Sequence, residues 1–260
     1  MKHKPVVLCL SGHDPCGGAG IQADIEVINS HSCHPASLIT CLTQQDTHNV
    51  TNIWPQPVEH FMAQATSLIQ DLDVNVIKIG LIGSVDLAMA IVQIIKGLPH
   101  IPVVLDPVLA AGGGKNLSHT SLLNTLVEQL IPHVTLLTPN SQEARLLSGK
   151  NSLGDAASVL QDMGAKYVLI TGSHEETATV DNTLYMPDKT EQIFHWERLP
   201  GQYHGSGCTL ASACAALLAR GFDVYTAVSE AQDFTWQALE NAYQTGSGQL
   251  NPDRMFWCEA

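Results

Sequence analysis

The stretch Tyr203-His-Gly-Ser-Gly-Cys-Thr209, followed by Leu-Ala-Ser-Ala-Cys-Ala-Ala-Leu-Leu at 210–218, says most about the fold. The small apolar residues predict a buried helix that starts at the glycine loop. Free N–H groups and the positive end of the helix dipole would make this start a site for a phosphate. Cys208 lies inside the loop, where the same field favours a thiolate. A helix that only packs in the core would begin in the same way, with Cys208 as a small apolar side chain.

Composition limits the classes of partner. The chain has 260 residues, of which 45% are hydrophobic, and its net charge is −13. We therefore expect a single domain over 1–260 with a large core, and no nucleic acid or anionic membrane as partner, since both require basic surfaces. No apolar run is long enough to span a membrane, and the N-terminus has no signal-peptide pattern. Seven scattered cysteines indicate reduced thiols and a cytoplasmic protein.

Short β-branched runs alternate with longer helical patterns along the chain. This rhythm predicts an α/β fold with a central, mostly parallel sheet and helices on both faces. A small β-hairpin is expected near 181–196, around Pro187-Asp-Lys. The expected strands are 6–10, 36–42, 76–79, 103–105, 134–137 and 167–170, and the expected helices are 17–29, 58–72, 85–95, 122–130, 156–163, 208–220 and 224–243.

Two carboxylates follow neighbouring strands of this predicted sheet. Asp106 ends one strand, and Asn140-Ser-Gln-Glu143 follows the next and begins a helix. Ligands of such sheets bind beyond the carboxyl ends of the strands, so both carboxylates would face the phosphate loop, where they suit Mg²⁺. Each also has a plainer interpretation, Asp106 as an Asp-Pro turn and Glu143 as a first-turn carboxylate that complements the helix dipole.

A second glycine-rich turn lies near the N-terminus. Asp14 and Gly17-Gly-Ala-Gly20 precede a helix in which Asp24 comes one turn later. Gln45 follows the second predicted strand, and its amide can both donate to and accept from a heteroaromatic ring. An exposed helical Asp24 and a purely structural Gln45 are the alternatives.

Taken in order, these motifs resemble the hydroxymethylpyrimidine and phosphomethylpyrimidine kinases of thiamine biosynthesis, in the ribokinase superfamily. The resemblance covers nearly the whole chain and is most specific in its first and last motifs. The matching segments are Gly12-His-Asp-Pro-Cys-Gly-Gly-Ala-Gly-Ile-Gln-Ala-Asp24, Leu42-Thr-Gln-Gln-Asp-Thr47, Lys78-Ile-Gly80, Leu105-Asp-Pro-Val108, Leu137-Thr-Pro-Asn140 with Glu143, and His204-Gly-Ser-Gly-Cys-Thr209.

The resemblance implies a ribokinase-like three-layer fold and ATP-dependent phosphorylation of 4-amino-5-hydroxymethyl-2-methylpyrimidine, and of its monophosphate. ATP and Mg²⁺ would be the cofactors, and a homodimer is expected. By position, Cys208 would be the base, and Gly205, Ser206 and Gly207 the anion hole. The implied substrate residues are Gln45, Asp24, Gly12, Leu81 and Val108; the nucleotide residues are Asn140, Thr171, Gly172, Gly205 and Gly207; and the magnesium residues are Asp106 and Glu143.

The sequence also departs from the family pattern. Cys16 replaces a serine, and Leu81 stands where methionine is common. Gly112-Gly-Gly114 and Thr171-Gly-Ser173 lack the lysines usual in those stretches, so two positive charges near the triphosphate are missing, unless Lys115 supplies one. A pyridoxal or pyridoxine kinase, and a ligand-binding protein that has lost catalysis on the same fold, are the alternatives. The retained Asp106, Glu143 and Cys208 favour a kinase.

Overall fold

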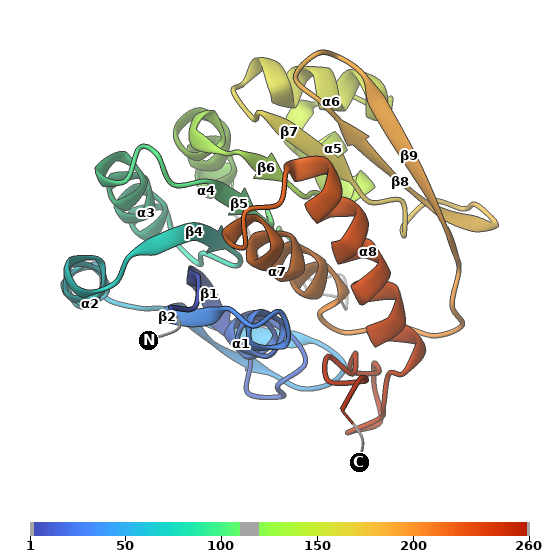
Figure 1. Cartoon of the computed structure of the whole chain (residues 1–260), viewed down its shortest axis with the longest axis horizontal. Helices are drawn as coiled ribbons and strands as arrows, with labels where there is room; N and C mark the ends of the chain where they lie inside the picture. The colour runs from blue at the N-terminus through green and yellow to red at the C-terminus, as the bar shows by residue number, and fades with distance from the viewer. Residues whose placement is uncertain (1–2, 110–119, 259–260) are drawn as a thin grey trace.

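One mixed sheet of nine strands, with helices on both faces, is formed by the residues that the structure describes (Figure 1). The computed structural model describes residues 3–109 and 120–258. The strand order is β3-β2-β1-β4-β5-β6-β7-β8-β9. Strands β2, β1, β4, β5, β6 and β7 run parallel to one another, whereas β3 at one edge and the β8–β9 hairpin at the other pair antiparallel.

The strands are β1 (Val6–His13), β2 (His34–Gln45), β3 (Val50–Pro55), β4 (Val74–Ile79), β5 (Val103–Leu105), β6 (Leu136–Leu137), β7 (Tyr167–Ile170), β8 (Thr179–Tyr185) and β9 (Glu191–Glu197). The α-helices are α1 (Gly20–Ser30), α2 (Val58–Asp71), α3 (Val85–Gly97), α4 (Thr120–Thr125), α5 (Ser141–Ser148), α6 (Leu153–Asp162), α7 (Ser206–Ala219) and α8 (Val224–Glu240).

Side-chain alternation along the central strands builds two cores, one on each face of the sheet. In β1, Leu8 and Leu10 pack with α2 to α6, whereas Val7 and Cys9 pack with α1, α7 and α8. Figure 1 shows α7 and α8 in front of the sheet. The run of alanines makes α7 thin, so it is buried between α1, α8 and strands β1, β4 and β5. This placement brings the start of α7 to the carboxyl ends of the parallel strands.

The structure extends the predicted elements and corrects some of them. β3 was not predicted because this exposed edge strand carries polar residues and ends at Pro55. The helix predicted over 122–130 is α4 followed by a π-helical turn, Leu126–Leu130, and a 3₁₀ turn, Ile131–His133. Pro132 has no N–H to continue an α-helix. The predicted hairpin is longer, Thr179–Glu197, and extends the main sheet through β7.

The first helix begins at Gly20 rather than at residue 17. Gly17 has a φ of +79°, and the Asp14 carboxylate accepts hydrogen bonds from the N–H groups of Cys16 and Ala19, both at 2.8 Å. Residues 14–19 therefore form a tight loop instead of a helical turn. Among the described residues, none of the helices is both long and apolar enough to cross a membrane.

Candidate active site

A cavity of about 660 Å³ opens at the carboxyl ends of the parallel strands and at the start of α7. It is continuous from the Asp14 loop, past the ends of β4 and β5, to the β8–β9 hairpin and α8. The predicted site residues that line it are Gly12, Gln45, Leu81, Asp106, Val108, Asn140, Glu143, Thr171, Gly205, Ser206, Gly207 and Cys208. The other two, Asp24 and Gly172, do not line it.

Gly205 holds the glycine loop at the start of α7 against the Asp14 loop. Its φ is +83°, a left-handed conformation that favours glycine. A Cβ here would collide with the carbonyl oxygen of Gly18. The two glycine loops therefore touch backbone to backbone, which fixes the start of α7 relative to the other wall of the cavity.

Arg254, which the sequence did not mark as a site residue, stabilises the contact between the Gly205 loop and the Asp14 loop. Its guanidinium donates to the carbonyl of Gly18, to the Thr209 hydroxyl at 3.0 Å and to the Glu26 carboxylate at 2.9 Å. The side chain is buried, which is rare for arginine without partners on each nitrogen. The only sequence signal is that Arg254 is the single lysine or arginine after Arg220, which is too weak to predict a contact with a loop almost fifty residues earlier.

Cys208 differs from the predicted thiolate. Burial, with a smaller contribution from the Asp106 and Asp24 carboxylates, raises the pKa of its thiol to about 12, against the opposing effect of Lys78. The side chain is half-buried, faces Asp106 and forms a hydrogen bond with it. Cys208 is therefore a neutral thiol at pH 7, because burial, helped by the two carboxylates, outweighs the field of the helix start.

Asp106 and Glu143 are both nearly buried at the cavity floor. Burial raises the pKa of Asp106 to about 6, with Lys78 opposing. Burial and the negative charge of Asp106 raise the pKa of Glu143 to about 8. Glu143 accepts from the N–H groups of Leu109 at 3.3 Å and Asn140 at 2.9 Å, and the Asn140 side chain caps α5 in return.

These two carboxylates fit a divalent cation. The negative charge of Asp106 raises the pKa of Glu143, and a cation between the two carboxylates would relieve this repulsion. Oxygen is the ligand that Mg²⁺ prefers. The described residues contain no group of three or more His, Cys, Asp or Glu side chains that could hold a metal ion. The remaining ligands would therefore be phosphate oxygens and water.

Asp24 lies beneath the cavity floor, which corrects its predicted contact with substrate. It is fully buried and pairs with the equally buried Lys78 at 2.7 Å. The hydroxyls of Ser11 and Ser212 donate to its two oxygens at 2.6 and 2.7 Å. Both of its oxygens accept from protein groups and the side chain is fully buried, so Asp24 supports the floor instead of reaching a ligand.

The far end of the cavity holds residues that the sequence did not predict. Trp196 and Trp236 stack with ring centroids 6.4 Å apart, and the Trp196 indole donates to Gln232 at 3.0 Å. The Arg198 guanidinium donates hydrogen bonds to backbone carbonyls within residues 173–179. Gly172 packs against the backbone of Asp181, which explains why it does not line the cavity. Gly112-Gly-Gly114 and Lys115 lie outside the described residues.

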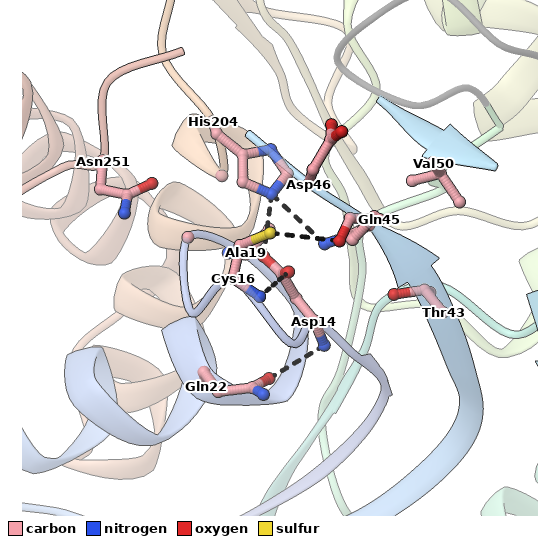
Figure 2. A network of polar contacts seen from close by, with 12 residues as sticks. Asp14, Cys16, Ala19, Gln22, Thr43, Gln45, Asp46, Val50, His204 and Asn251 are labelled. Carbon is pink, nitrogen blue, oxygen red and sulfur yellow. Dashed lines mark hydrogen bonds and ion pairs between the residues drawn. The ribbon is translucent and has the colours of Figure 1, made fainter. Parts of the chain in front are cut away.

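At the opposite end, Asp14, Gln45 and His204 form a polar cluster (Figure 2). His204 Nε2 is 2.8 Å from Asp14 Oδ2 and 3.5 Å from Gln45 Nε2. Burial alone would raise the pKa of Asp14, but hydrogen bonds with His204 and Gln45 lower it to about 2. Asp14 is therefore a carboxylate, and its neighbours are donors.

Comparison with known proteins places this architecture in a family. The family model described as phosphomethylpyrimidine kinase matches residues 14–253. The chain belongs to the phosphomethylpyrimidine kinase family. It is 34% identical to the hydroxymethylpyrimidine/phosphomethylpyrimidine kinase of Streptomyces coelicolor, over 94% of this chain and 92% of that protein. It is 35% identical to the protein of the same description from Bacillus subtilis, over 93% and 91%.

Solved structures confirm the predicted ribokinase-like fold and bring in a second activity. An ADP complex of Bacillus subtilis pyridoxal kinase has a TM-score of 0.91 at 28% identity and covers 98% of this chain and 99% of that one. The phosphomethylpyrimidine kinase of Clostridium difficile has a TM-score of 0.80 at 27% identity, over 91% and 100%. The pyridoxal kinase and the phosphomethylpyrimidine kinase thus share one backbone fold, so the choice of substrate depends on individual side chains.

Proposed function

We propose that this chain transfers the γ-phosphoryl group of ATP to the hydroxymethyl oxygen of 4-amino-5-hydroxymethyl-2-methylpyrimidine, and then phosphorylates the monophosphate, in thiamine biosynthesis. The observation that carries the proposal is one continuous cavity lined by the Gln45 amide, by the loop Gly205–Cys208 at the start of α7, and by two buried carboxylates, Asp106 and Glu143. Membership of a phosphomethylpyrimidine kinase family supports the same activity.

Each group of cavity residues has a different proposed role, according to its position. Gly12, Leu81 and Val108 would enclose the ring, whose edge would meet Gln45. Backbone N–H groups at the start of α7 would hold the transferred phosphoryl group, and Thr171 and Asn140 would contact the nucleotide phosphates. Asp106 and Glu143 would hold Mg²⁺, which supplies positive charge to the phosphate oxygens when bound.

Proton transfer would involve Cys208 and Asp106 together. A thiol with a raised pKa is a poor base, but Asp106 has a pKa of about 6 and forms a hydrogen bond with it. The alcohol proton would pass to the sulfur as the thiol proton passes to the carboxylate. Phosphoryl transfer has a loose transition state, so positioning and charge should contribute more than this base.

Pyridoxal kinase activity is the second candidate, favoured by the TM-score of 0.91 with the Bacillus subtilis enzyme. Purified protein should be assayed for ADP formation with ATP, Mg²⁺ and, separately, the pyrimidine alcohol, its monophosphate and pyridoxal. We expect turnover with both pyrimidines and loss of turnover in EDTA. Turnover with pyridoxal alone would favour the second candidate; ligand binding by calorimetry without turnover would indicate a protein that has lost catalysis.

We also propose one domain, a homodimer and a cytoplasmic location. Exposed Leu42 and Trp54 face each other across the β2–β3 edge, which suits contact with a second copy. All seven cysteines are unpaired, as expected in a reducing compartment. Light scattering of the purified protein would test the dimer.

A further inference from the structure

The Arg254 guanidinium lies directly behind the glycine loop that starts α7. It donates to the carbonyl of Gly18 in the Asp14 loop and, at 3.0 Å, to the Thr209 hydroxyl in the first turn of α7. Thr209 in turn donates to the carbonyl of Gly205 at 2.8 Å. A Cβ added to Gly205 would come within 2.9 Å of an Arg254 nitrogen. One planar cation therefore joins the two glycine loops.

The segment that carries Arg254 is itself fixed to the fold. The Leu250 carbonyl, four residues earlier, accepts from the N–H of His204 at 2.9 Å, and the Ser30 hydroxyl donates to the Arg254 carbonyl at 2.7 Å. The third guanidinium nitrogen donates to the Glu26 carboxylate of α1 at 2.9 Å. Arg254 is thus held at its backbone and at all three side-chain nitrogens, so it constrains the loops that it contacts.

Two different links join the loops on opposite sides of their contact. On the cavity side, His204 Nε2 is 2.8 Å from Asp14 Oδ2, and both residues line the cavity (Figure 2). Arg254 does not line the cavity, so its link lies on the other side. Between them, the Gly18 carbonyl faces the Cα of Gly205, which offers it no N–H or O–H group. Arg254 therefore supplies the only donor that this buried carbonyl has among the described residues.

We propose that Arg254 is a positioning residue for phosphoryl transfer, which sets the spacing of the two glycine loops and so places the N–H groups that would meet the transferred phosphoryl group. This inference rests on the proposed kinase activity, but not on which ring is phosphorylated. A displacement of about 1 Å at a site that positions reacting groups can lower the rate about 100-fold. Contacts that form only in the transition state affect kcat and leave KM unchanged.

The test is removal of the guanidinium and its return as a free ion. With ATP, Mg²⁺ and 4-amino-5-hydroxymethyl-2-methylpyrimidine, Arg254→Ala should lower kcat by about 100-fold. The KM values of both substrates should stay within about 3-fold of those of the parent protein. Guanidinium chloride, well below denaturing concentrations, can fill the vacated space and donate to the same three acceptors. It should raise the kcat of Arg254→Ala by about 10-fold or more, whereas equal sodium chloride should not.

Controls separate this role from a loss of stability. Leu160→Ala empties a fully buried position in the core on the other face of the sheet, so its melting temperature should fall while kcat of the folded protein stays at the parent value. Arg220→Ala removes an exposed arginine at the other end of α7 and should keep the parent kcat with or without guanidinium.

A second variant tests the link without emptying the arginine site. Thr209→Val keeps the shape of the side chain and removes the hydroxyl between Arg254 and Gly205. It should lower kcat by about 10-fold, because a charged donor loses its partner, and guanidinium should not restore it. This variant keeps the inference testable if Arg254→Ala does not fold.

The outcomes distinguish the inference from the function. A parent kcat in both Arg254→Ala and Thr209→Val would overturn the inference while the function stands. The same holds if the loss appears in KM instead of kcat, if guanidinium does not restore Arg254→Ala, or if Leu160→Ala loses as much kcat at an equal fall in melting temperature. If the parent protein phosphorylates neither pyrimidine nor pyridoxal, the proposed function itself fails.

Discussion

At the scale of single residues, environment changes what a residue type can do. A cysteine at a helix start is usually expected to have a lowered pKa, yet burial and two carboxylates raise that of Cys208 to about 12. Asp24 looked accessible from its place in a helix, yet it is paired with a buried lysine. In both cases the deciding neighbours come from other elements of the fold, and the local sequence does not contain them.

Cys208 is testable by removal. Cys208→Ala should lower kcat by about 100-fold, near the lower limit for general base catalysis, because the proton path to Asp106 is interrupted. Cys208→Ser should retain part of the activity, because a hydroxyl can still bridge the alcohol and the carboxylate. Binding of the pyrimidine, followed by calorimetry, should hardly change. A kcat equal to that of the parent in Cys208→Ala would remove this residue from the mechanism.

Glu143 should impose a pH dependence on stability. Its pKa is raised from 4.5 to about 8 in the folded protein, so the folded state binds a proton more tightly than the unfolded state. The free energy of unfolding without metal should therefore fall as the pH rises from about 4.5 to about 8. Glu143→Gln should remove most of this slope and raise the Mg²⁺ concentration needed for turnover. Denaturant titrations at several pH values measure the slope; an identical slope in Glu143→Gln would contradict the assignment.

At the scale of elements, the start of α7 depends on contact between two loops. Glycine at 205 is required both by its positive φ and by the nearby carbonyl of Gly18. The sequence predicted the loop, and its binding of phosphate stays a prediction. It did not predict that the Asp14 loop and Arg254 would be part of the same structure, because those contacts link residues far apart in the chain.

Substitution of Gly205 separates the effect of its positive φ from the effect of its close contact with the Gly18 carbonyl. Gly205→Ala should reduce kcat strongly and lower stability by more than the roughly 1–3 kcal/mol that a left-handed conformation costs a non-glycine residue. Gly221→Ala is the matched control, because its φ is +91° but nothing lies within 4 Å of a Cβ there. Thermal unfolding and kcat should be measured for both. Equal loss of stability in the two variants would mean that the contact with Gly18 contributes nothing.

At the scale of the whole molecule, alternating side chains of a parallel sheet separate two cores and leave the strand ends free for chemistry. This much could be predicted, because β-branched runs, helical periods and glycine loops are local signals. The edge strand β3 and the π-helical turn at Leu126–Leu130 could not, since tertiary packing decides them. Most of the residues expected at the site line one cavity because motifs at strand ends converge, whereas their roles stay predictions. Their protonation states were missed because they depend on burial.

The buried Lys78–Asp24 pair joins β4 to α1 beneath the cavity, so breaking it should destabilise the fold. Lys78→Met leaves a fully buried carboxylate without its cation and should lower the free energy of unfolding by about 3–5 kcal/mol. Adding Asp24→Asn should recover part of this loss. Lys189→Met, which breaks an exposed pair at 3.6 Å with Asp162, should cost less than about 1 kcal/mol. Similar losses from the buried and exposed pairs in denaturant titrations would show that Lys78 and Asp24 are not coupled.

The central claim is that this cavity phosphorylates a pyrimidine alcohol in preference to pyridoxal. The most direct measurement is a competition, in which equal concentrations of 4-amino-5-hydroxymethyl-2-methylpyrimidine and pyridoxal share limiting ATP with Mg²⁺. Mass spectrometry of the phosphomonoesters at early times gives the ratio of the two kcat/KM values. We predict that the pyrimidine phosphate dominates by about 10-fold or more, since we expect the Gln45 amide to pair better with the aminopyrimidine edge than with pyridoxal. Equal products, or an excess of pyridoxal phosphate, would contradict it.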